Sequence, residues 1–325
     1  MNKIRWGILS TGSIARTFVE GLRFVEDAEV VAVGSRNREQ AEQFGEKYGI
    51  PHRHSSYEAL AADPDVDVIY VATPHIFHHE NTMLCLRAGK AVLCEKAFTI
   101  NAAEAAEMID YAHQHKLFLM EAMWVRYLPV HVKLRELLKE GIIGDVKIVH
   151  ADFSFSAPYN PQSRLFNLEL GGGALLDAGI YPVSMASMIL GTPSKITSLT
   201  HLGESGSDEQ TVIQFGYPEG KLSTLVTSTR VAGPQDLLIR GTKGYIKISQ
   251  WLRPSRLTIV RPQQEDEVIE LPVEGNGYNY EAAEVGRCLR EGLLESPVMP
   301  LDESLALMQT MDAIRAPWGL KYPTE

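Results

Sequence analysis

The chain has 325 residues, of which 45% are hydrophobic and 22% are charged, and its formal net charge is −10. This length predicts about two domains that bury their own cores, and the negative charge argues against nucleic acid and anionic membranes as partners. Three cysteines in no disulfide or metal spacing (Cys85, Cys94 and Cys288), no signal peptide and no stretch of bilayer-spanning length predict a cytoplasmic protein.

Strand and helix patterns alternate over the first 122 residues. Short apolar runs typical of buried strands occupy 4–9, 29–34, 67–73, 91–94 and 117–120. Apolar residues at helical spacing fill the segments between them, at 14–25, 41–48, 78–88 and 102–112. Strands separated by helices predict parallel βαβ units with right-handed crossovers, and hence an α/β domain of residues 1–122 with a Rossmann-type doubly wound sheet.

The pattern changes in residues 123–325, the predicted second domain. Residues 151–156 alternate apolar and polar, and an apolar helix is expected at 174–190 after three glycines. Strand-like segments follow without intervening helices, at 196–202, 211–217, 221–229, 236–240, 245–249 and 257–260. We expect an α+β domain with an open, mostly antiparallel sheet whose partly polar face meets solvent or a second subunit. Two terminal helices are expected at about 281–291 and 304–315. They belong to the second domain in this prediction, and the alternative is that they pack back on the first domain.

A glycine-containing turn follows the first predicted strand. The dinucleotide fingerprint is G-x-G-x-x-G/A, and this chain has Ser10-x-Gly12-x-x-Ala15. Gly12 lets the backbone approach a pyrophosphate, and the helix N terminus attracts it. By itself the turn has a purely structural alternative, but its place in a βαβ series favours nucleotide binding. The predicted phosphate-binding residues are Ser10, Thr11, Gly12, Ser13 and Ile14.

The end of the second predicted strand indicates the cofactor. NAD-binding proteins place an acidic residue there to bind the ribose hydroxyls. This chain has Ser35, Arg36 and Arg38 instead, and two guanidinium groups suit a 2′-phosphate. Two solvated arginines at a helix start are the alternative. We therefore predict NADP(H).

The end of the third strong strand is expected to border the nicotinamide ribose. The predicted residues there are Thr73, Pro74, His75 and His78. Three histidines stand close together here, because His79 follows. They lack the glutamate of the helical zinc motif and a clear third ligand, so we predict no metal site.

Charged and phenolic groups mark a chemical site. Glu95 and Lys96 end the strand at 91–94, where ligands of open α/β sheets bind, although a simple surface pair is the alternative. Asp177 and Tyr181 are four residues apart and share a helix face. A lysine cation favours the phenolate of a nearby tyrosine, which suits acid–base catalysis. A capped aspartate and a half-buried tyrosine are the alternative.

These motifs together resemble the Gfo/Idh/MocA (glucose–fructose oxidoreductase/inositol dehydrogenase) family. They are residues 7–15, Glu95-Lys96 and 172–181, and the resemblance spans essentially the whole chain. Segments 120–127 and 245–251 look closest to the branch of dimeric dihydrodiol dehydrogenase and NADP-dependent D-xylose dehydrogenase. The resemblance implies a homodimer formed through the open sheet and a catalytic pair, Lys96 and Tyr181, with Asp177 in the family's D-x-G-x-[H/Y] pattern. Ala97 departs from the usual Glu-Lys-Pro, and Tyr181 stands where many relatives carry histidine.

The same branch implies aromatic side chains along the substrate pocket. Trp124, Phe153 and Trp251 match them, with core packing as the alternative, and Arg126 and Asp177 are polar candidates. We therefore expect an NADP-dependent dehydrogenase or reductase that transfers hydride between nicotinamide and a sugar or diol/hydroxy-carbonyl substrate, of the D-xylose or trans-dihydrodiol type. A catalytically silent NADP sensor and a sugar oxidoreductase that never releases its cofactor are the alternatives.

Overall fold

The computed structural model describes residues 3–325, which form two compact units. Unit 1 comprises the residues up to Tyr127 together with Glu274–Leu305. Unit 2 comprises Leu128–Val273 and Ala306–Glu325. The chain therefore passes from one unit to the other at three points, and a segment from near its end completes unit 1.

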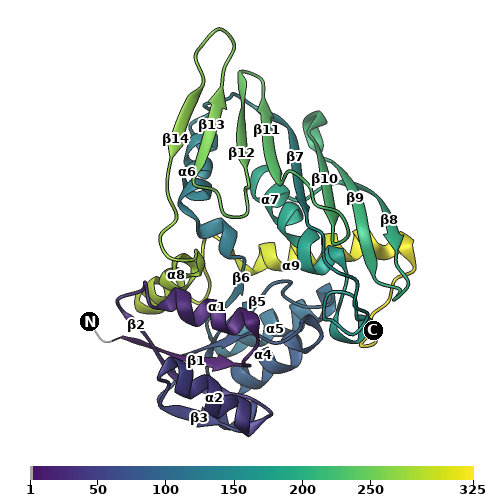
Figure 1. Ribbon diagram of the computed structural model, residues 1–325. Coiled ribbons are helices and arrows are strands. Elements are labelled where there is room, and N and C mark those ends of the chain that lie inside the picture. Colours follow the sequence, from purple (N-terminus) through teal and green to yellow (C-terminus); the bar gives the residue numbers. More distant parts are fainter. Residues whose placement is uncertain (1–2) are drawn as a thin grey trace. The chain divides into compact units, whose positions relative to one another are not determined.

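Unit 1 is built on a sheet of six strands, all parallel, in the order β3-β2-β1-β4-β5-β6 (Figure 1). This order has the reversal at β1 and β4 that defines a doubly wound sheet, and it confirms the predicted Rossmann fold. The strands are β1 (Ile4–Leu9), β2 (Ala28–Gly34), β3 (His52–His54), β4 (Val68–Val71), β5 (Ala91–Glu95) and β6 (Leu119–Ala122).

Several helices of unit 1 begin or end at a capping residue. Asn37, Ser56 and Asn101 each accept a hydrogen bond at a helix N terminus, and Gly49 ends α2 in the left-handed conformation. Helix α8 packs against α1, and α4 packs against α5. The helices are α1 (Ser13–Leu22), α2 (Arg38–Tyr48), α3 (Tyr57–Ala61), α4 (His78–Arg87), α5 (Ala102–His115) and α8 (Tyr278–Glu291), with short turns η1 (His75–Phe77) and η2 (Trp124–Tyr127).

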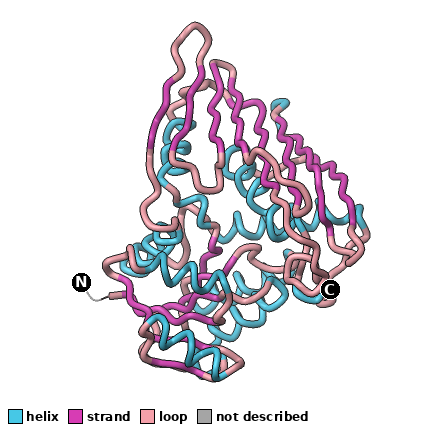
Figure 2. The backbone as a smooth tube through the Cα atoms, in the orientation of Figure 1, coloured by secondary structure: helices cyan, strands magenta, loops and turns pink. Residues whose placement is uncertain are grey.

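Unit 2 is built on a sheet of eight strands in the order β14-β13-β12-β11-β7-β10-β9-β8 (Figure 1). These strands are drawn in magenta in Figure 2. Only β7 and β10 pair in parallel, so the predicted mostly antiparallel sheet is confirmed. The strands are β7 (Val146–Ser154), β8 (Lys195–Leu202), β9 (Asp208–Gly216), β10 (Leu222–Ser228), β11 (Asp236–Gly241), β12 (Gly244–Ser249), β13 (Arg256–Val260) and β14 (Glu267–Glu270).

The apolar helix after the triple glycine packs against the middle of this sheet, on β7 and β10. It opens with a π-helical turn, η4 (Leu175–Gly179), and continues as α7 (Ile180–Leu190). Helix α6 (Pro129–Lys139) also belongs to unit 2, and α9 (Leu301–Arg315) carries the chain from unit 1 into unit 2. The segment Leu168–Leu190 has the length and the mean hydropathy, 1.4, of a membrane span, which the sequence analysis did not expect. Because 78% of that stretch is buried inside the protein, its apolar character serves the core.

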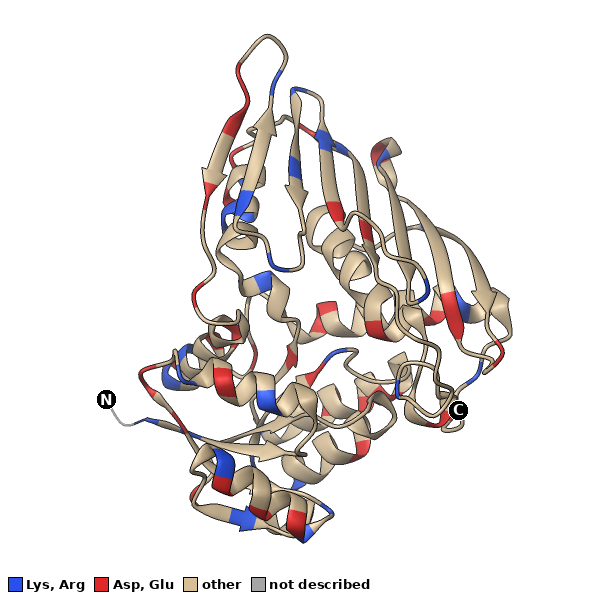
Figure 3. Cartoon of the chain, in the orientation of Figure 1, with Lys and Arg blue, Asp and Glu red and all other residues tan. Residues whose placement is uncertain are grey.

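The two faces of the eight-stranded sheet differ in what they expose. One face carries buried side chains such as Ile213, Leu225 and Ile239. The other face carries exposed apolar residues in neighbouring strands. For example, Leu199 of β8 pairs with Val212 of β9, and both are exposed. Lys and Arg are interspersed with Asp and Glu over both units (Figure 3).

Candidate functional site

The turn between β1 and α1 has the form that a pyrophosphate requires. Ser10 has a φ of 97°, and Gly12 is the N-cap of α1, with no side chain capping that helix. A Cβ placed on Gly12 would have one near neighbour, the hydroxyl of Ser10, at 3.8 Å. Gly12 and Ser13 are exposed. The N terminus of α1 is thus open to an anionic ligand, so the turn fits the phosphates of a dinucleotide.

The end of β2 presents two cationic side chains to solvent. Arg36 and Arg38 are exposed, and the guanidinium carbon of Arg36 lies 5.3 Å from the ring centre of Phe77. The phenol of Tyr57, at the start of α3, faces Ser10 and Arg36. Burial raises the pKa of Tyr57, and the positive charge of Arg36 partly opposes this rise. Sequence reasoning missed Tyr57, because it follows a short polar strand and belongs to no motif.

The residues after β4 form a mostly buried turn. The side chains of Thr73 and His75 are buried. His78 is 1% exposed, and its two ring nitrogens lie 2.8 Å and 2.7 Å from the carbonyl oxygens of Thr73 and Ala97. His78 therefore ties the end of β4 to the loop after β5. His79 lies beside Glu107 instead, at 3.0 Å, so the neighbouring histidines share no ligand position.

The end of β5 places Glu95 and Lys96 on a network of buried polar groups. The hydroxyl of Tyr70 donates a short hydrogen bond to Glu95. The backbone N–H of Lys96 donates to the other carboxylate oxygen of Glu95, at 3.1 Å, and the Lys96–Ala97 peptide bond is cis. Glu281 of α8 is fully buried, and burial followed by the charge of Glu95 holds its pKa well above the ordinary value. The hydrogen bonds of Glu95 therefore hold the backbone next to Lys96 in place.

Three of these segments follow neighbouring strands of one parallel sheet. The turn at Gly12 follows β1, Thr73 follows β4, and Lys96 follows β5, and β1, β4 and β5 are adjacent. The carboxyl ends of parallel strands lie at the same sheet edge, so the predicted cofactor residues of unit 1 gather there. The reversal point of the strand order, between β1 and β4, lies at the centre of this edge.

In unit 2, Asp177 and Tyr181 lie at the start of the buried apolar helix. Asp177 is in the π-helical turn, a feature that is frequent at functional sites, and its carboxylate accepts a hydrogen bond of 2.6 Å from Arg164. The ring of Tyr181 contacts Phe153 of β7 edge to face, with centroids 5.5 Å apart. Arg164 is exposed, and as a single arginine in an irregular loop it gave no sequence signal.

The other predicted substrate residues are engaged in packing. Trp124 stacks on Tyr278 with ring centroids 4.8 Å apart. Arg126 is 1% exposed, and its guanidinium donates to Glu303 at 2.7 Å. Trp251 is fully buried, and its indole N–H donates to the carbonyl of Asp152 at 2.8 Å. Arg126 and Trp251 thus hold the fold around them, and a role of either in binding substrate stays a prediction.

Comparisons with known proteins agree with this architecture. Residues 4–123 match the family model described as "Oxidoreductase family, NAD-binding Rossmann fold", and residues 131–247 match the GFO/IDH/MocA C-terminal domain. The mouse trans-1,2-dihydrobenzene-1,2-diol dehydrogenase is 40% identical, with 99% of each chain covered. The D-xylose 1-dehydrogenase (NADP(+)) of Hypocrea jecorina is 37% identical, with 98% of this chain and 93% of the relative covered.

Solved structures with the same fold cover nearly the whole chain. KijD10, a 3-ketoreductase from Actinomadura kijaniata crystallised with NADP and TDP-benzene, superposes with a TM-score of 0.87 at 26% identity, with 97% of this chain and 98% of that chain covered. The aldose–aldose oxidoreductase of Caulobacter crescentus superposes with a TM-score of 0.89 at 25% identity, with 97% of both chains covered.

The Rossmann unit, together with these relatives, defines a nucleotide-dependent oxidoreductase. Both family models match in chain order and together cover most of the sequence. The protein belongs to the Gfo/Idh/MocA family of oxidoreductases, which confirms the predicted family and fold.

Proposed function

We propose that this protein transfers hydride reversibly between NADP(H) and the carbinol carbon of a sugar or diol, or the matching hydroxy-carbonyl compound. The observation that carries the proposal is the gathering of the Gly12 turn, Thr73 and Lys96 at one sheet edge, beside the strand-order reversal. Arg36 and Arg38 favour NADP(H) because they follow β2, where NAD-binding proteins carry an acidic residue, and because guanidinium groups suit a 2′-phosphate.

The bound cofactor supplies the hydride chemistry, and the chain's own residues position the substrate and move a proton. In this proposal the ammonium group of Lys96 donates a hydrogen bond to the substrate oxygen and stabilises negative charge on it. Tyr181, as the phenolate that the lysine cation favours, accepts the hydroxyl proton during oxidation, and as the phenol it returns that proton during reduction. Asp177 binds a second hydroxyl of the substrate, with Arg164 orienting its carboxylate at 2.6 Å.

The relatives narrow the substrate class. One is named for a trans-dihydrodiol and the other for D-xylose, and both substrates carry neighbouring hydroxyl groups. Phe153, which is partly exposed beside Tyr181, suits the apolar face of either a sugar ring or an arene diol. We further propose that the protein acts in the cytoplasm as a homodimer that joins through the open face of the eight-stranded sheet.

Substitution of the two proposed catalytic groups tests the mechanism. Lys96→Met and Tyr181→Phe are each expected to lower kcat at least ~100-fold, because each removes one proton-handling or charge-stabilising group. The affinity for NADPH, measured by fluorescence titration, should change little. Steady-state absorbance of the reduced cofactor over aldoses and trans-dihydrodiols provides the rates.

Matched controls are Lys139→Met and Tyr48→Phe, which change the same side chains at the end of α6 and in α2. Both controls should retain full turnover. Near-normal kcat in both Lys96→Met and Tyr181→Phe would exclude the mechanism. No turnover by the unmodified protein with any substrate, together with tight NADPH binding, would favour the sensor alternative.

A sugar–sugar oxidoreductase with a resident cofactor is a second candidate, favoured by the structural likeness to the aldose–aldose oxidoreductase. Desalting followed by absorbance measurement distinguishes the two. Cofactor that stays with the protein supports the resident-cofactor reaction, and cofactor that is lost supports an ordinary dehydrogenase.

A further inference from the structure

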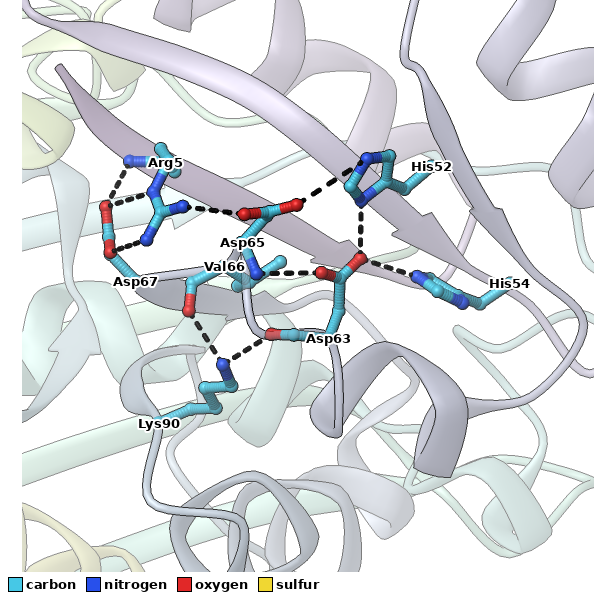
Figure 4. Close-up of polar contacts among 8 residues, drawn as sticks. All are labelled: Arg5, His52, His54, Asp63, Asp65, Val66, Asp67 and Lys90. Carbon is cyan, nitrogen blue, oxygen red and sulfur yellow. Dashed lines mark hydrogen bonds and ion pairs between the residues drawn. The ribbon is translucent and has the colours of Figure 1, made fainter.

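Two histidines project from the same face of β3, at the edge of the six-stranded sheet. Successive residues of a strand point to opposite faces, so His52 and His54, two residues apart, lie on one side (Figure 4). Asp63, which follows α3, faces both of them. The three residues come from a strand and from a loop that the fold brings together, and all of them belong to unit 1.

The three side chains converge on one point. Nδ1 of His52 lies 2.7 Å from Oδ2 of Asp63, and Nε2 of His54 lies 2.8 Å from the same oxygen. All three atoms lie within 4.8 Å of one another. Zn²⁺ and similar ions bind such nitrogen and oxygen ligands at about 2.0–2.2 Å. A small outward shift of the imidazole rings from Asp63 therefore makes room for an ion between them.

The aspartate lies behind the two histidines, and the histidines are accessible to solvent. The side chain of Asp63 is 3% exposed, whereas those of His52 and His54 are 37% and 24% exposed. Oδ2 of Asp63 lies against both imidazoles, and Oδ1 accepts a hydrogen bond from the backbone N–H of Asp65. An ion can thus reach the imidazoles from solvent and meet the carboxylate of Asp63 behind them.

Other groups hold the ligands in place. The N–H of Asp65 donates to Oδ1 of Asp63 at 2.9 Å, which leaves Oδ2 facing the histidines. The ammonium of Lys90 donates to the carbonyl oxygens of Asp63 and Val66, at 2.5 Å and 2.8 Å. Arg5 holds the Asp65 carboxylate at 3.0 Å. The loop between α3 and β4 is therefore fixed before any ion binds.

The second ring nitrogen of His52 also has a partner suited to metal binding. Nε2 of His52 lies 3.9 Å from a carboxylate oxygen of Asp65. Histidine ligands commonly donate their other N–H to a carboxylate, which fixes the tautomer and makes the ligating nitrogen more basic. At 3.9 Å Asp65 does not form this hydrogen bond, and a small movement of the His52 ring toward it would bring the two groups together.

We propose that His52 Nδ1, His54 Nε2 and Asp63 Oδ2 bind a divalent transition-metal ion, with Zn²⁺ the best match to the ligand set, and with water completing the coordination. On binding, each neutral imidazole transfers its proton to the other ring nitrogen, so the ion replaces two N–H···O hydrogen bonds. The site is separate from the proposed catalytic residues. The ion would tie the edge strand β3 to the loop after α3 and so stabilise unit 1.

Metal binding to the full-length protein, stripped of metal with a chelator, provides the test. Titration with Co²⁺, followed by its visible absorption and by displacement with Zn²⁺, should show binding of one ion per chain. The double variant H52Q/H54Q should lose this binding. Asp65→Asn should weaken it about tenfold, the lower range for loss of a carboxylate partner behind a histidine ligand. Zn²⁺ should raise the melting temperature of the unmodified protein and not that of H52Q/H54Q.

The matched control is H113Q/H115Q, which removes two exposed histidines of α5. This control should bind Co²⁺ as the unmodified protein does. Absence of Co²⁺ uptake, or equal uptake by H52Q/H54Q and the unmodified protein, would overturn the proposal and leave a purely hydrogen-bonded His–Asp–His cluster. NADPH-dependent turnover should be the same with and without chelator, which separates this test from that of the proposed function.

Discussion

Ser10 occupies the place of the first glycine in the dinucleotide fingerprint, and its φ of 97° is one that glycine adopts easily. A non-glycine residue in a sparsely populated backbone region costs on the order of 1–3 kcal/mol. The N–H of Ser10 donates to the carbonyl of Gly34 at 2.9 Å, so the end of β2 holds the turn in place. A search for the strict glycine motif would therefore miss this turn, because here the hydrogen bond to the neighbouring strand holds a serine in the conformation that glycine adopts.

The two exposed arginines after β2 allow a test of cofactor choice. The double variant R36A/R38A should raise the Kd for NADPH at least ~10-fold, since each lost charge-assisted hydrogen bond to a phosphate is worth ~1.5 kcal/mol or more. The Kd for NADH, which lacks the 2′-phosphate, should change much less. Isothermal titration calorimetry with both cofactors measures the difference.

Arg87→Ala, at the exposed end of α4, serves as the control for loss of positive charge and should leave both affinities unchanged. If R36A/R38A weakened NADH and NADPH equally, the arginines would not contact the 2′-phosphate.

The start of the α7 segment depends on a buried carboxyl group that sequence patterns did not reveal. Asp208, the first residue of β9, accepts a hydrogen bond of 2.6 Å from the N–H of Leu175. Its other oxygen has no hydrogen-bond partner among residues 3–325. Burial raises the pKa of Asp208 to about 7, although the hydrogen bond from Leu175 acts in the opposite direction. This element therefore begins next to a group that resists ionisation.

The free energy of unfolding should consequently depend on pH through Asp208. The carboxyl group keeps its proton in the folded state up to about pH 7 but loses it near pH 4 when unfolded. Between these values the unfolded state binds fewer protons, so stability falls as pH rises, by on the order of 4 kcal/mol in total. Asp208→Asn keeps an acceptor for Leu175 and removes this loss, so the variant should gain stability relative to the unmodified protein as pH rises.

Urea unfolding at about pH 5 and about pH 8 measures the effect. Asp302→Asn, at the exposed start of α9, is the matched control and should show the same pH dependence as the unmodified protein. A constant difference between Asp208→Asn and the unmodified protein at both pH values would contradict the prediction.

The open face of the eight-stranded sheet exposes several large apolar side chains. Leu199, Val212 and Leu222 are 76%, 43% and 52% exposed, on three neighbouring strands. The strand register places Ile148 beside Leu222, and Val212 beside Leu199 and Val226. Gln214 and Thr224 separate these two apolar groups on the same face. Exposed apolar residues on one open sheet face are consistent with the proposed homodimer.

If the proposed homodimer joins through this face, Val212→Glu should convert it to a monomer, because the substitution places one charge from each subunit in a self-complementary apolar interface. Light scattering coupled to size-exclusion chromatography measures the molar mass, and circular dichroism checks that the variant is folded. Val132→Glu is the control, since Val132 lies on α6 with a similar exposure of 38%. A folded Val212→Glu variant of unchanged molar mass, or a monomeric unmodified protein, would exclude this interface.

The sequence analysis did not predict some short elements and isolated side chains that the structure shows. Strand β3 has three polar or charged residues and no apolar run, so neither it nor the His52–His54 pair was predicted. The π-helical turn has the same apolar composition as an ordinary helix and was predicted as one. Tyr57 and Arg164 stand outside any motif, and only their neighbours in space connect them with Arg36 and Asp177.

The sequence by itself determined the βαβ alternation of the first unit, the mostly antiparallel sheet of the second and the family, because periodicity, capping and motifs act over a few residues. Only the tertiary structure decided that Glu274–Leu305 completes unit 1, that Trp251 is wholly buried, and that Asp63 meets two histidines. These outcomes depend on which segments pack together at long range, and packing fixes burial, charge neighbours and ligand geometry, none of which is a property of a short stretch of sequence.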